Sequence, residues 1–287
     1  MTCLCPVDGS DGSGLFGEEL LRFQAEQTQV GRQCRGGSCA PACSRVAYAG
    51  LATSQECTEL RERAEALLAY CDVNGGNEDD GEDGDVSNLD LSDAAESGDV
   101  RLALLLLRLI ERLRRVVAHE YGLPPSRLVA STAFVARIRA ASAERRRGRR
   151  ADGSEAGVCV AHADESSYDS YHYSAVLHLH SVGDGFTGGS FVFTDPSGDP
   201  ESDAAGASLH SSSQKVRRLT RLEPQAGRAL LFSSGWENAH YVEDVHEGGT
   251  RYALPVFFRT AEDAPDDIGF EIARELCKLW SGGEPSQ

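Results

Sequence analysis

The stretch HADESSYDSYHYSAVLHLH, residues 162–180, contains four of the eight histidines of the chain and three carboxylates. Histidine at this density is typical of a metal site, of acid–base chemistry or of an ordinary polar surface. On a β-strand His162 and Asp164 project from the same side, because side chains alternate along a strand. They would provide two of the three ligands of a 2-His-1-carboxylate site, which suits Fe(II) and leaves coordination positions open.

A third ligand has to come from another strand. His240 is a candidate, and Arg251 follows eleven residues later, near the start of a β-type run. The planar guanidinium of arginine suits bidentate binding of a carboxylate. A metal centre with an inward-facing arginine therefore predicts a site for a small carboxylic acid that contacts both.

The rest of the chain predicts helices first and strands later. A strand near Ala47 leads to Thr53 and Glu56, whose spacing fits a capping box at the start of a helix that continues through Leu68. Asp99 is positioned to cap a second helix over about residues 100–121, with an apolar face of Leu102, Leu105, Leu106, Leu109, Leu113 and Val116; Gly122, Pro124 and Pro125 end it.

Short β-type runs separated by turn residues follow this second helix. They are STAFVARIR, GVCVAHAD, YHYSAVLHLH, GGSFVFT, VRRLTRLE, RALLFSS and RYALPVFFRT. This order predicts an α+β fold: a double-stranded β-helix, or jelly-roll, core with N-terminal supporting helices and a C-terminal helix. The predicted division is a tail at 1–42, a domain at 43–264 with an acidic insert at 72–99 and a polar loop at 195–214, and a helix and tail at 265–287.

The charge is uneven along the chain. The formal net charge of -17 argues against a nucleic-acid-binding protein. Residues 72–99 have the composition of a disordered acidic insert, and residues 137–150 contain seven arginines. One interpretation is that both segments are solvated loops. The other is that the arginines bind an acidic substrate or the chain's own acidic insert.

No stretch predicts a membrane segment or a secretory signal. The longest apolar run, residues 102–110, is too short to span a bilayer. The sequence alone thus predicts a soluble protein, cytoplasmic if Met1 is the true start. Nine cysteines, among them Cys34, Cys39, Cys43 and Cys57, keep the lumen of the endoplasmic reticulum as the alternative.

The order of the motifs resembles the Fe(II)/2-oxoglutarate dioxygenases of the prolyl 4-hydroxylase type. The matching pieces are HAD, YHYSAVLHLH, GGSF, PQAGRALLF and HYVEDVHEGGTR, within about residues 157–262. The resemblance implies that His162, Asp164 and His240 bind Fe(II). It also implies that Arg251 binds the distal carboxylate of 2-oxoglutarate, and that Ser174, His178 and Phe191 line the cosubstrate pocket.

The resemblance further implies that O2 and 2-oxoglutarate are consumed, that succinate and CO2 are released, and that ascorbate supports the reaction. The expected substrate is a protein or peptide side chain, with proline first and lysine second; the oligomeric state is not indicated. Many members of the family have tyrosine where this chain has His178. A protonated imidazole there would make cosubstrate affinity depend on pH.

Two alternatives remain open. His178 and His180 form an HxH pair that also suits zinc in a cupin-like site, and the barrel could be a non-catalytic binding module. His172, His180, His210 and His246 are otherwise expected to be surface or loop residues. On the substrate side, the sequence suggests Trp236, Glu237 and Asn238 as lining residues, Tyr168 and Tyr171 as a cover, the polar loop as a lid and the arginine-rich segment as a binding site for an acidic peptide.

Overall fold

The structure is a computed structural model. It describes residues 2–3, 45–74, 86–140, 161–168, 170–195, 218–246 and 248–260.

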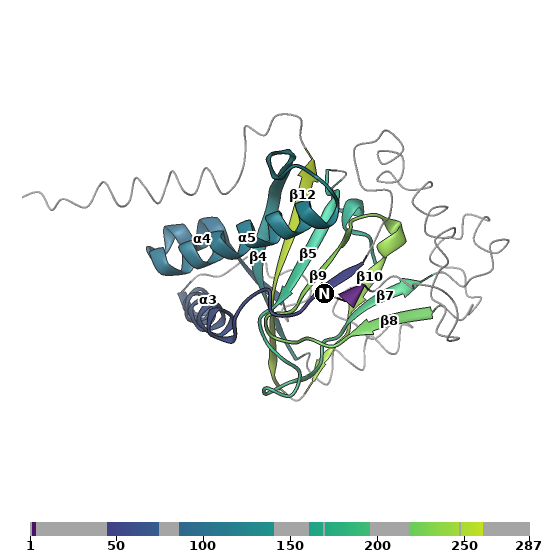
Figure 1. The fold of residues 1–287 in the computed structure, drawn as a ribbon. Helices are drawn as coiled ribbons and strands as arrows, with labels where there is room; N and C mark the ends of the chain where they lie inside the picture. The colour runs from purple at the N-terminus through teal and green to yellow at the C-terminus, as the bar shows by residue number, and fades with distance from the viewer. Residues whose placement is uncertain are drawn as a thin grey trace, which may run out of the picture.

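An antiparallel seven-stranded sheet forms the centre of the described chain (Figure 1). Its order is β1-β2-β9-β5-β12-β4-β3, so strands from both halves of the sequence lie side by side. The bounds are β1 Thr2–Cys3, β2 Val46–Tyr48, β3 Val86–Asp90, β4 Leu128–Arg139, β5 Tyr173–His178, β9 Ala229–Ser233 and β12 Thr250–Thr260.

A smaller sheet packs against one face of the large sheet. Its order is β10-β7-β8, and a two-stranded ladder pairs β11 with β6. Buried aromatic and aliphatic side chains from both sheets form one apolar cluster between them, which includes Val176, Phe191, Phe193, Leu230 and Phe232. The bounds are β6 Thr187–Gly188, β7 Phe191–Asp195, β8 Arg218–Leu222, β10 His240–Val242 and β11 Val245–His246.

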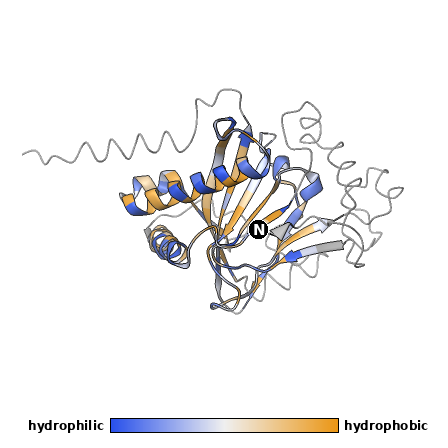
Figure 2. Ribbon diagram, viewed as in Figure 1, coloured by the Kyte–Doolittle hydropathy of each residue, from blue (hydrophilic) through white to orange (hydrophobic). Residues whose placement is uncertain are grey.

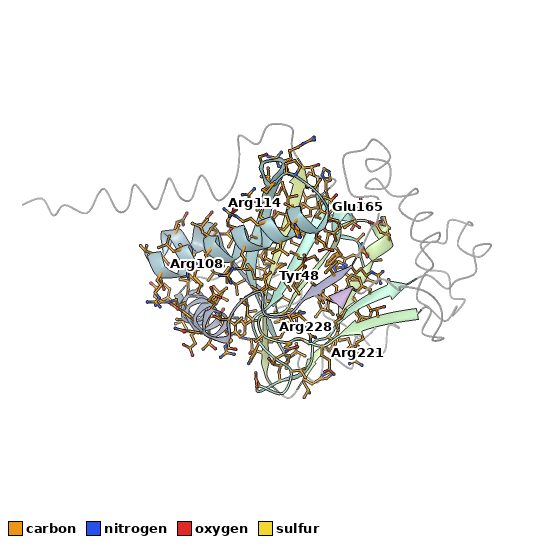
Figure 3. All side chains as sticks on the ribbon, in the orientation of Figure 1. Tyr48, Arg108, Arg114, Glu165, Arg221 and Arg228 are labelled. Carbon is orange, nitrogen blue, oxygen red and sulfur yellow. The ribbon has the colours of Figure 1, made fainter. Side chains whose placement is uncertain are left out.

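Helices cover the opposite face of the large sheet. Their apolar sides turn toward the strands, as the hydropathy colouring indicates (Figure 2), and the polar sides carry arginines such as Arg108 and Arg114 (Figure 3). The helices are α3 Ser54–Asn74, α4 Leu91–Glu96 and α5 Val100–Glu120, and short 3-10 turns occur at η1 Pro125–Arg127, η2 Asp164–Ser166 and η3 Trp236–Asn238.

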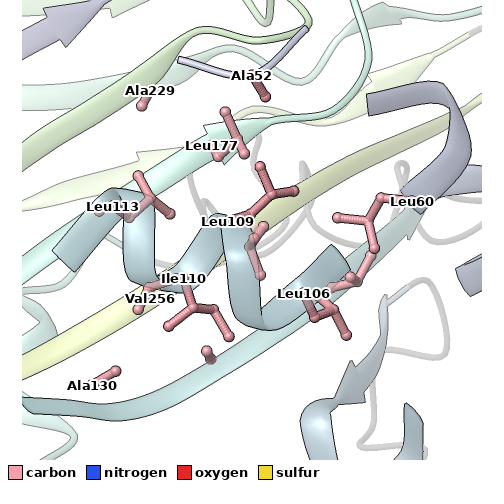
Figure 4. Close-up of a cluster of buried hydrophobic side chains, with 14 of the residues drawn as sticks. Ala52, Leu60, Leu106, Leu109, Ile110, Leu113, Ala130, Leu177, Ala229 and Val256 are labelled. Carbon is pink, nitrogen blue, oxygen red and sulfur yellow. The ribbon is translucent and has the colours of Figure 1, made fainter. Parts of the chain in front are cut away.

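The sequence-based expectations for α3 and α5 are confirmed. Thr53 Oγ1 accepts from the backbone N–H of Glu56 at 3.1 Å, and Glu56 Oε2 accepts from the N–H of Thr53 at 2.9 Å. Asp99 caps α5 by accepting from the N–H of Leu102. Leu106, Leu109, Ile110 and Leu113 of α5 then pack with Leu60, Leu177 and Val256 in the main core (Figure 4).

The acidic segment departs from expectation. Within the predicted disordered insert, residues 86–90 form β3, which pairs with β4, and residues 91–96 form α4, which buries Leu91 and Ala94. A few apolar residues at the right spacing are enough to form these two elements, because β4 supplies the hydrogen bonds of the strand. Residues 75–85, the polar loop after β7, the arginines within 145–150 and the expected C-terminal helix lie outside the described residues.

Arg137 and Arg139 link the arginine-rich segment to the acidic one. Both guanidinium groups contact Asp72 near the end of α3, at 2.9 and 2.7 Å. Arg137 also bonds to Ser87 of β3 at 2.9 Å. Among the interpretations offered by the sequence, the contacts of these two arginines agree with the one in which the basic segment binds the chain's own acidic segment.

Candidate metal centre and active site

The backbones of His162 and His240 bind each other directly. The two residues form an antiparallel bridge in which His162 N–H donates to His240 O at 3.0 Å and His240 N–H donates to His162 O at 2.9 Å. His240 begins β10, which also pairs with β7. The two imidazole rings consequently lie 4.8 Å apart between centroids.

Asp164 completes a compact group of three possible metal ligands. Its Oδ1 lies 3.6 Å from Nε2 of His162 and 3.6 Å from Nε2 of His240. One ligand atom from each residue falls within 4.8 Å of the others. The expectation of a regular strand through HAD was wrong, because Asp164 begins the η2 turn. The turn still directs the carboxylate toward both imidazoles.

Neighbouring polar groups fix two of these ligands. Ser174 Oγ of β5 donates to Asp164 Oδ2 at 2.5 Å and contacts Ser234 Oγ at 2.8 Å. His240 Nδ1 lies 2.9 Å from the carbonyl of Asn238. Since a carbonyl only accepts, Nδ1 carries the proton and Nε2 keeps its lone pair toward Asp164. Such outer partners orient metal ligands and set their tautomers.

The protonation states also suit a cation. Burial alone raises the pKa of Asp164, but the two histidines and the Ser174 hydroxyl outweigh it, so the pKa is lowered. Burial lowers the pKa of His240, which Asp164 opposes only in part. A carboxylate and a neutral imidazole are the forms in which these side chains bind metals.

The group is open on one side. The side chain of His162 is 35% exposed, whereas those of Asp164 and His240 are 6% exposed. Phe191 stacks on the His240 ring at 4.6 Å, and Phe232 meets the same ring edge-on. The apolar side is therefore closed by aromatic rings, and access is from the side of His162.

A second polar group lies farther along the same face of the large sheet. Ser174, Val176 and His178 share one face of β5, so His178 is about 13 Å from Ser174 along the strand. Arg251 of β12 is 2% exposed, and its Nη2 lies 3.5 Å from His178 Nδ1. A buried cation thus follows the metal-ligand group, with Val176 between them.

The double glycine of GGSF makes room for this arginine. A Cβ atom on Gly189 would lie 2.8 Å from Arg251 Cδ, and one on Gly188 would lie 2.2 Å from the carbonyl oxygen of Asp244. Both glycines also have positive φ, at +64° and +73°, which side chains rarely adopt. The motif is needed here for close approach of Arg251 as well as for the turn.

The surroundings of His178 disfavour the positive charge that the sequence-based hypothesis gave it. Burial, with Arg251 and Arg228 nearby, lowers its pKa well below 6.5. This shift favours the neutral imidazole, and the hypothesis of a protonated His178 that binds a carboxylate stays a prediction. With Nδ1 facing the Arg251 guanidinium, Nε2 carries the proton, and it has no hydrogen-bond partner among the described residues.

These groups fit the cofactors of a 2-His-1-carboxylate enzyme. His162, Asp164 and His240 offer two nitrogens and one oxygen with an open side, as non-haem Fe(II) requires. The unpartnered N–H of His178 beside the Arg251 guanidinium offers donors to one end of a dicarboxylate, and the buried apolar cluster lies alongside. Ser174 and Phe191 contact Asp164 and His240 respectively, so both adjoin the metal ligands.

Other candidate residues have different surroundings from those expected. His180 follows β5, where its Nδ1 lies 3.0 Å from the Thr250 carbonyl. In the described part of the chain, the group of possible metal ligands includes neither His178 nor His180. Trp236 is 45% exposed, whereas Glu237 and Asn238 are 1% exposed; that these three residues line the substrate side stays a prediction.

Sequence reasoning missed the partners that hold the ligands. Ser234, Arg45 and the carbonyl of Asn238 have no motif that marks them, and Arg45 is 193 residues from the asparagine it contacts. The only local signal is the position of Asn238, two residues before His240.

Part of the chain matches a known protein family. Residues 152–259 match the 2OG-Fe(II) oxygenase superfamily, and the metal-ligand group and Arg251 all lie in that range. The sequence-based assignment to the Fe(II)/2-oxoglutarate dioxygenases is confirmed at the level of this superfamily.

The chain is similar to particular members. It is 35% identical over 103 residues to human 2-oxoglutarate and iron-dependent oxygenase domain-containing protein 3, covering 36% of this chain and 26% of that protein. The Xenopus tropicalis protein of the same name is 29% identical over 234 residues, covering 77% and 64%. This chain therefore spans about a quarter of the human relative in the matched region.

Two further proteins that this chain matches are prolyl hydroxylases by name. Chicken prolyl 3-hydroxylase 1 is 37% identical over 105 residues, covering 37% of this chain and 11% of that protein. The crystal structure of a Pseudomonas putida prolyl-4-hydroxylase overlaps with a TM-score of 0.45 at 17% identity, covering 76% of this chain and 92% of that one.

Among the helices that the structure describes, none has the length and the apolar character of a membrane-spanning segment.

Proposed function

We propose that the chain is an Fe(II)- and 2-oxoglutarate-dependent dioxygenase that hydroxylates a protein or peptide side chain, with proline favoured. His162, Asp164 and His240 are the proposed metal ligands. The observation that carries the proposal is their convergence to within 4.8 Å, on a face of the sheet that also carries a buried arginine. We further propose that the two facing sheets form a double-stranded β-helix within a domain spanning residues 43–264.

The proposed cosubstrate site extends from the metal centre to Arg251. The Arg251 guanidinium and the His178 Nε2–H bind the distal carboxylate, and the keto-acid end reaches the metal. Ser174 and Phe191 act at the near end of the pocket, where they contact the ligands Asp164 and His240. A buried ion pair of this kind is favourable only where further hydrogen bonds satisfy its remaining donors and acceptors, and the His178 Nε2–H is a donor available to the carboxylate.

Fe(II) held by His162, Asp164 and His240, with 2-oxoglutarate held by Arg251, would supply the oxidative chemistry that converts 2-oxoglutarate and O2 to succinate and CO2 and hydroxylates a substrate C–H bond. The residues of the chain orient the metal ligands and limit the access of water to the site. Ser174 and the Asn238 carbonyl orient the ligands, and the rings of Phe191 and Phe232 exclude water from one side. Ascorbate is proposed to maintain the reduced metal.

A series of aromatic rings beside the metal centre supports a polypeptide substrate. Phe257 is paired with Ser174 across the sheet and stacks on Tyr171 at 4.7 Å. Tyr171 in turn contacts Tyr168, which is 63% exposed. Aromatic surfaces of this kind suit extended, proline-containing peptides, and a relative bears the name prolyl 3-hydroxylase 1. The compartment, cytoplasm or endoplasmic reticulum, remains a prediction.

The test is an anaerobic titration of the purified protein with Fe(II) and 2-oxoglutarate, followed by the visible metal-to-ligand charge-transfer band. We expect the band in the wild type and not in His162→Ala. His119→Ala, an exposed histidine on α5, is the matched control and should keep the band.

Other outcomes of the titration would identify the alternatives. Stoichiometric zinc in the purified protein and no band would contradict the dioxygenase function and favour a zinc site at His178 and His180. A protein that binds neither metal would be a non-catalytic binding module. Succinate release with peptides that differ only at a proline then tests the substrate class.

A further inference from the structure

Arg45 is a buried arginine just before β2, and it contacts the turn that precedes the candidate metal ligand His240. It immediately precedes β2, which pairs with β9 through Val46 and Leu231, and it is 3% exposed. Its guanidinium carbon lies 4.2 Å above the centre of the Phe193 ring. Arg45 lies outside the region, residues 152–259, that matches the superfamily.

The guanidinium group binds the turn between β9 and β10 at two points. Its Nε donates to Asn238 Oδ1 at 2.6 Å, and its Nη2 donates to the Glu237 carbonyl at 2.9 Å. The amide nitrogen of Asn238 completes the arrangement by donating to Ser233 O at 3.0 Å and Ser233 Oγ at 2.8 Å. The side chain of Asn238 is thereby held from both ends, and the turn is fixed to β2 as well as β9.

His240, the last of the three possible metal ligands, follows this turn at the start of β10. The carbonyl of Asn238 accepts from Nδ1–H of His240 at 2.9 Å, which leaves Nε2 directed at Asp164. A rotation of the Asn238 peptide would move this carbonyl and release the imidazole from its orientation. The contacts therefore run in one line from Arg45 to Asn238 to His240.

We propose that Arg45 is a positioning residue for His240, a role that rests on the proposed function of His162, Asp164 and His240 as metal ligands. The planar guanidinium group of arginine donates hydrogen bonds in two directions at once, which the ammonium group of lysine cannot reproduce. Outer partners of metal ligands typically contribute 10- to 100-fold to metal affinity.

The experiment compares two buried arginines of the large sheet. Arg45→Gln removes the contacts with the turn, while Arg137→Gln removes a fully buried arginine that binds Asp72 on the helix-covered side. Co(II), which has visible ligand-field bands, is titrated into each metal-free protein, and thermal unfolding of the metal-free proteins is measured in parallel.

We expect Arg45→Gln to bind Co(II) about 10-fold more weakly than the wild type and to show altered bands. Arg137→Gln should keep the wild-type affinity and bands, although both variants unfold at lower temperature. Arg45→Lys, which retains one donor, should recover part of the affinity. In an Asn238→Ala background, where Arg45 has lost its side-chain partner, the Arg45→Gln effect should shrink.

Equal Co(II) affinity in Arg45→Gln and the wild type would overturn the positioning role and leave the proposed function intact. Equal weakening of Co(II) binding in Arg45→Gln and Arg137→Gln would also overturn the positioning role, because the loss of affinity would then come from lost stability. A wild-type protein that binds no Co(II) would overturn the proposed function, and the role of Arg45 with it.

Discussion

His178 shows how the environment of a single residue sets its charge. The imidazole is fully buried and faces Arg251 at 3.5 Å, so a second positive charge there would be unfavourable. Its pKa is accordingly lowered well below 6.5. The sequence reveals a histidine at this position, but it does not reveal the burial or the neighbouring guanidinium.

The affinity for 2-oxoglutarate should therefore be nearly constant between pH 6 and 8. Because the pKa of His178 is lowered, the residue is already neutral across this range and gains no proton as the pH falls to 6. Titration of the charge-transfer band at several pH values measures the affinity. An affinity that weakens steadily as the pH rises from 6 to 8 would mean that a protonated His178 binds the cosubstrate after all.

Replacement of Gly189 tests the space around Arg251. In Gly189→Ala the new Cβ would lie 2.8 Å from Arg251 Cδ, so the guanidinium must shift. We expect a loss of at least about 10-fold in 2-oxoglutarate affinity, since a 1.4 kcal/mol change in a buried contact has that effect, with Co(II) affinity unchanged. Isothermal titration calorimetry measures both.

Gly248→Ala provides the matched control for this variant. Gly248 has almost the same φ, +65°, but a Cβ there would meet nothing within 4 Å. Both variants carry the backbone strain, so they differ in the close contacts of the new Cβ atom, 2.8 Å to Arg251 Cδ and 3.2 Å to Val245 Cγ2. Equal losses of 2-oxoglutarate affinity in the two variants would show that strain alone is responsible.

At the scale of elements, α3 is stabilised at its start by a charged group. Glu56 completes the capping box with Thr53 and forms an ion pair with Arg112 of α5 at 2.8 Å. The hydrogen bonds from Arg112 lower the pKa of Glu56 from 4.5 to about 2. A lowered pKa in the folded state stabilises the protein above the unfolded pKa, and this contribution is lost as the pH falls.

Glu56→Gln should consequently lower the free energy of unfolding by about 1 kcal/mol at pH 7. Glutamine keeps the capping hydrogen bond, so the change isolates the charge. The difference from the wild type should shrink as the pH falls from about 4.5 toward 2, where Glu56 becomes protonated. Urea unfolding at pH 7, 5 and 3 provides the measurement.

Glu62→Gln on the same helix is the control for this prediction. Glu62 is exposed, so its replacement should change stability by less than about 0.5 kcal/mol at any of these pH values. A Glu56→Gln difference that stays constant down to pH 3 would contradict the assigned role of the Arg112 pair.

The elements that could be predicted from the sequence are those with strong local signals. The caps at Thr53 and Asp99 and the apolar face of α5 mark two helices, and alternating apolar runs mark most of the strands. Segments that depend on a distant partner were missed. β3 and α4 lie in an acidic stretch whose composition suggests disorder, and they form because β4 offers an open edge.

The same distinction applies to the candidate site. The spacing of HAD and the interval from His240 to Arg251 are visible in the sequence and led to the group that the fold brings together. Arg45 belongs to a different part of the chain and has no motif. Its contact with Asn238 exists only because β2 and β9 are neighbours in the sheet.

In the molecule as a whole, one sheet separates the helical core from the candidate site. Leu109 of α5 is fully buried against the helix-covered face of the sheet. Leu109→Ala should lower the free energy of unfolding by about 2–5 kcal/mol, as expected for a cavity in a packed core. Leu104→Ala on the same helix should cost less than about 0.5 kcal/mol, because Leu104 is 45% exposed.

Unfolding of Leu109→Ala should also release the metal in the same transition. The strands that Leu109 supports, β5 and β12, carry Ser174 and Arg251 on their other face. Circular dichroism and the Co(II) absorption, followed together during denaturation, should give coincident curves. Loss of Co(II) well before the helical signal would show that the two faces of the sheet unfold independently.

The central strand β5 has a final consequence for how this gene can change over generations. All six of its residues are buried, with Ala175 and Leu177 in the helical core and Ser174 and His178 on the side of the candidate site. Removing a single codon here would exchange the two sets, because every side chain after the deletion would turn to the other face. Insertions and deletions can therefore accumulate in the connecting segments, while β5 can be inherited only at its full length.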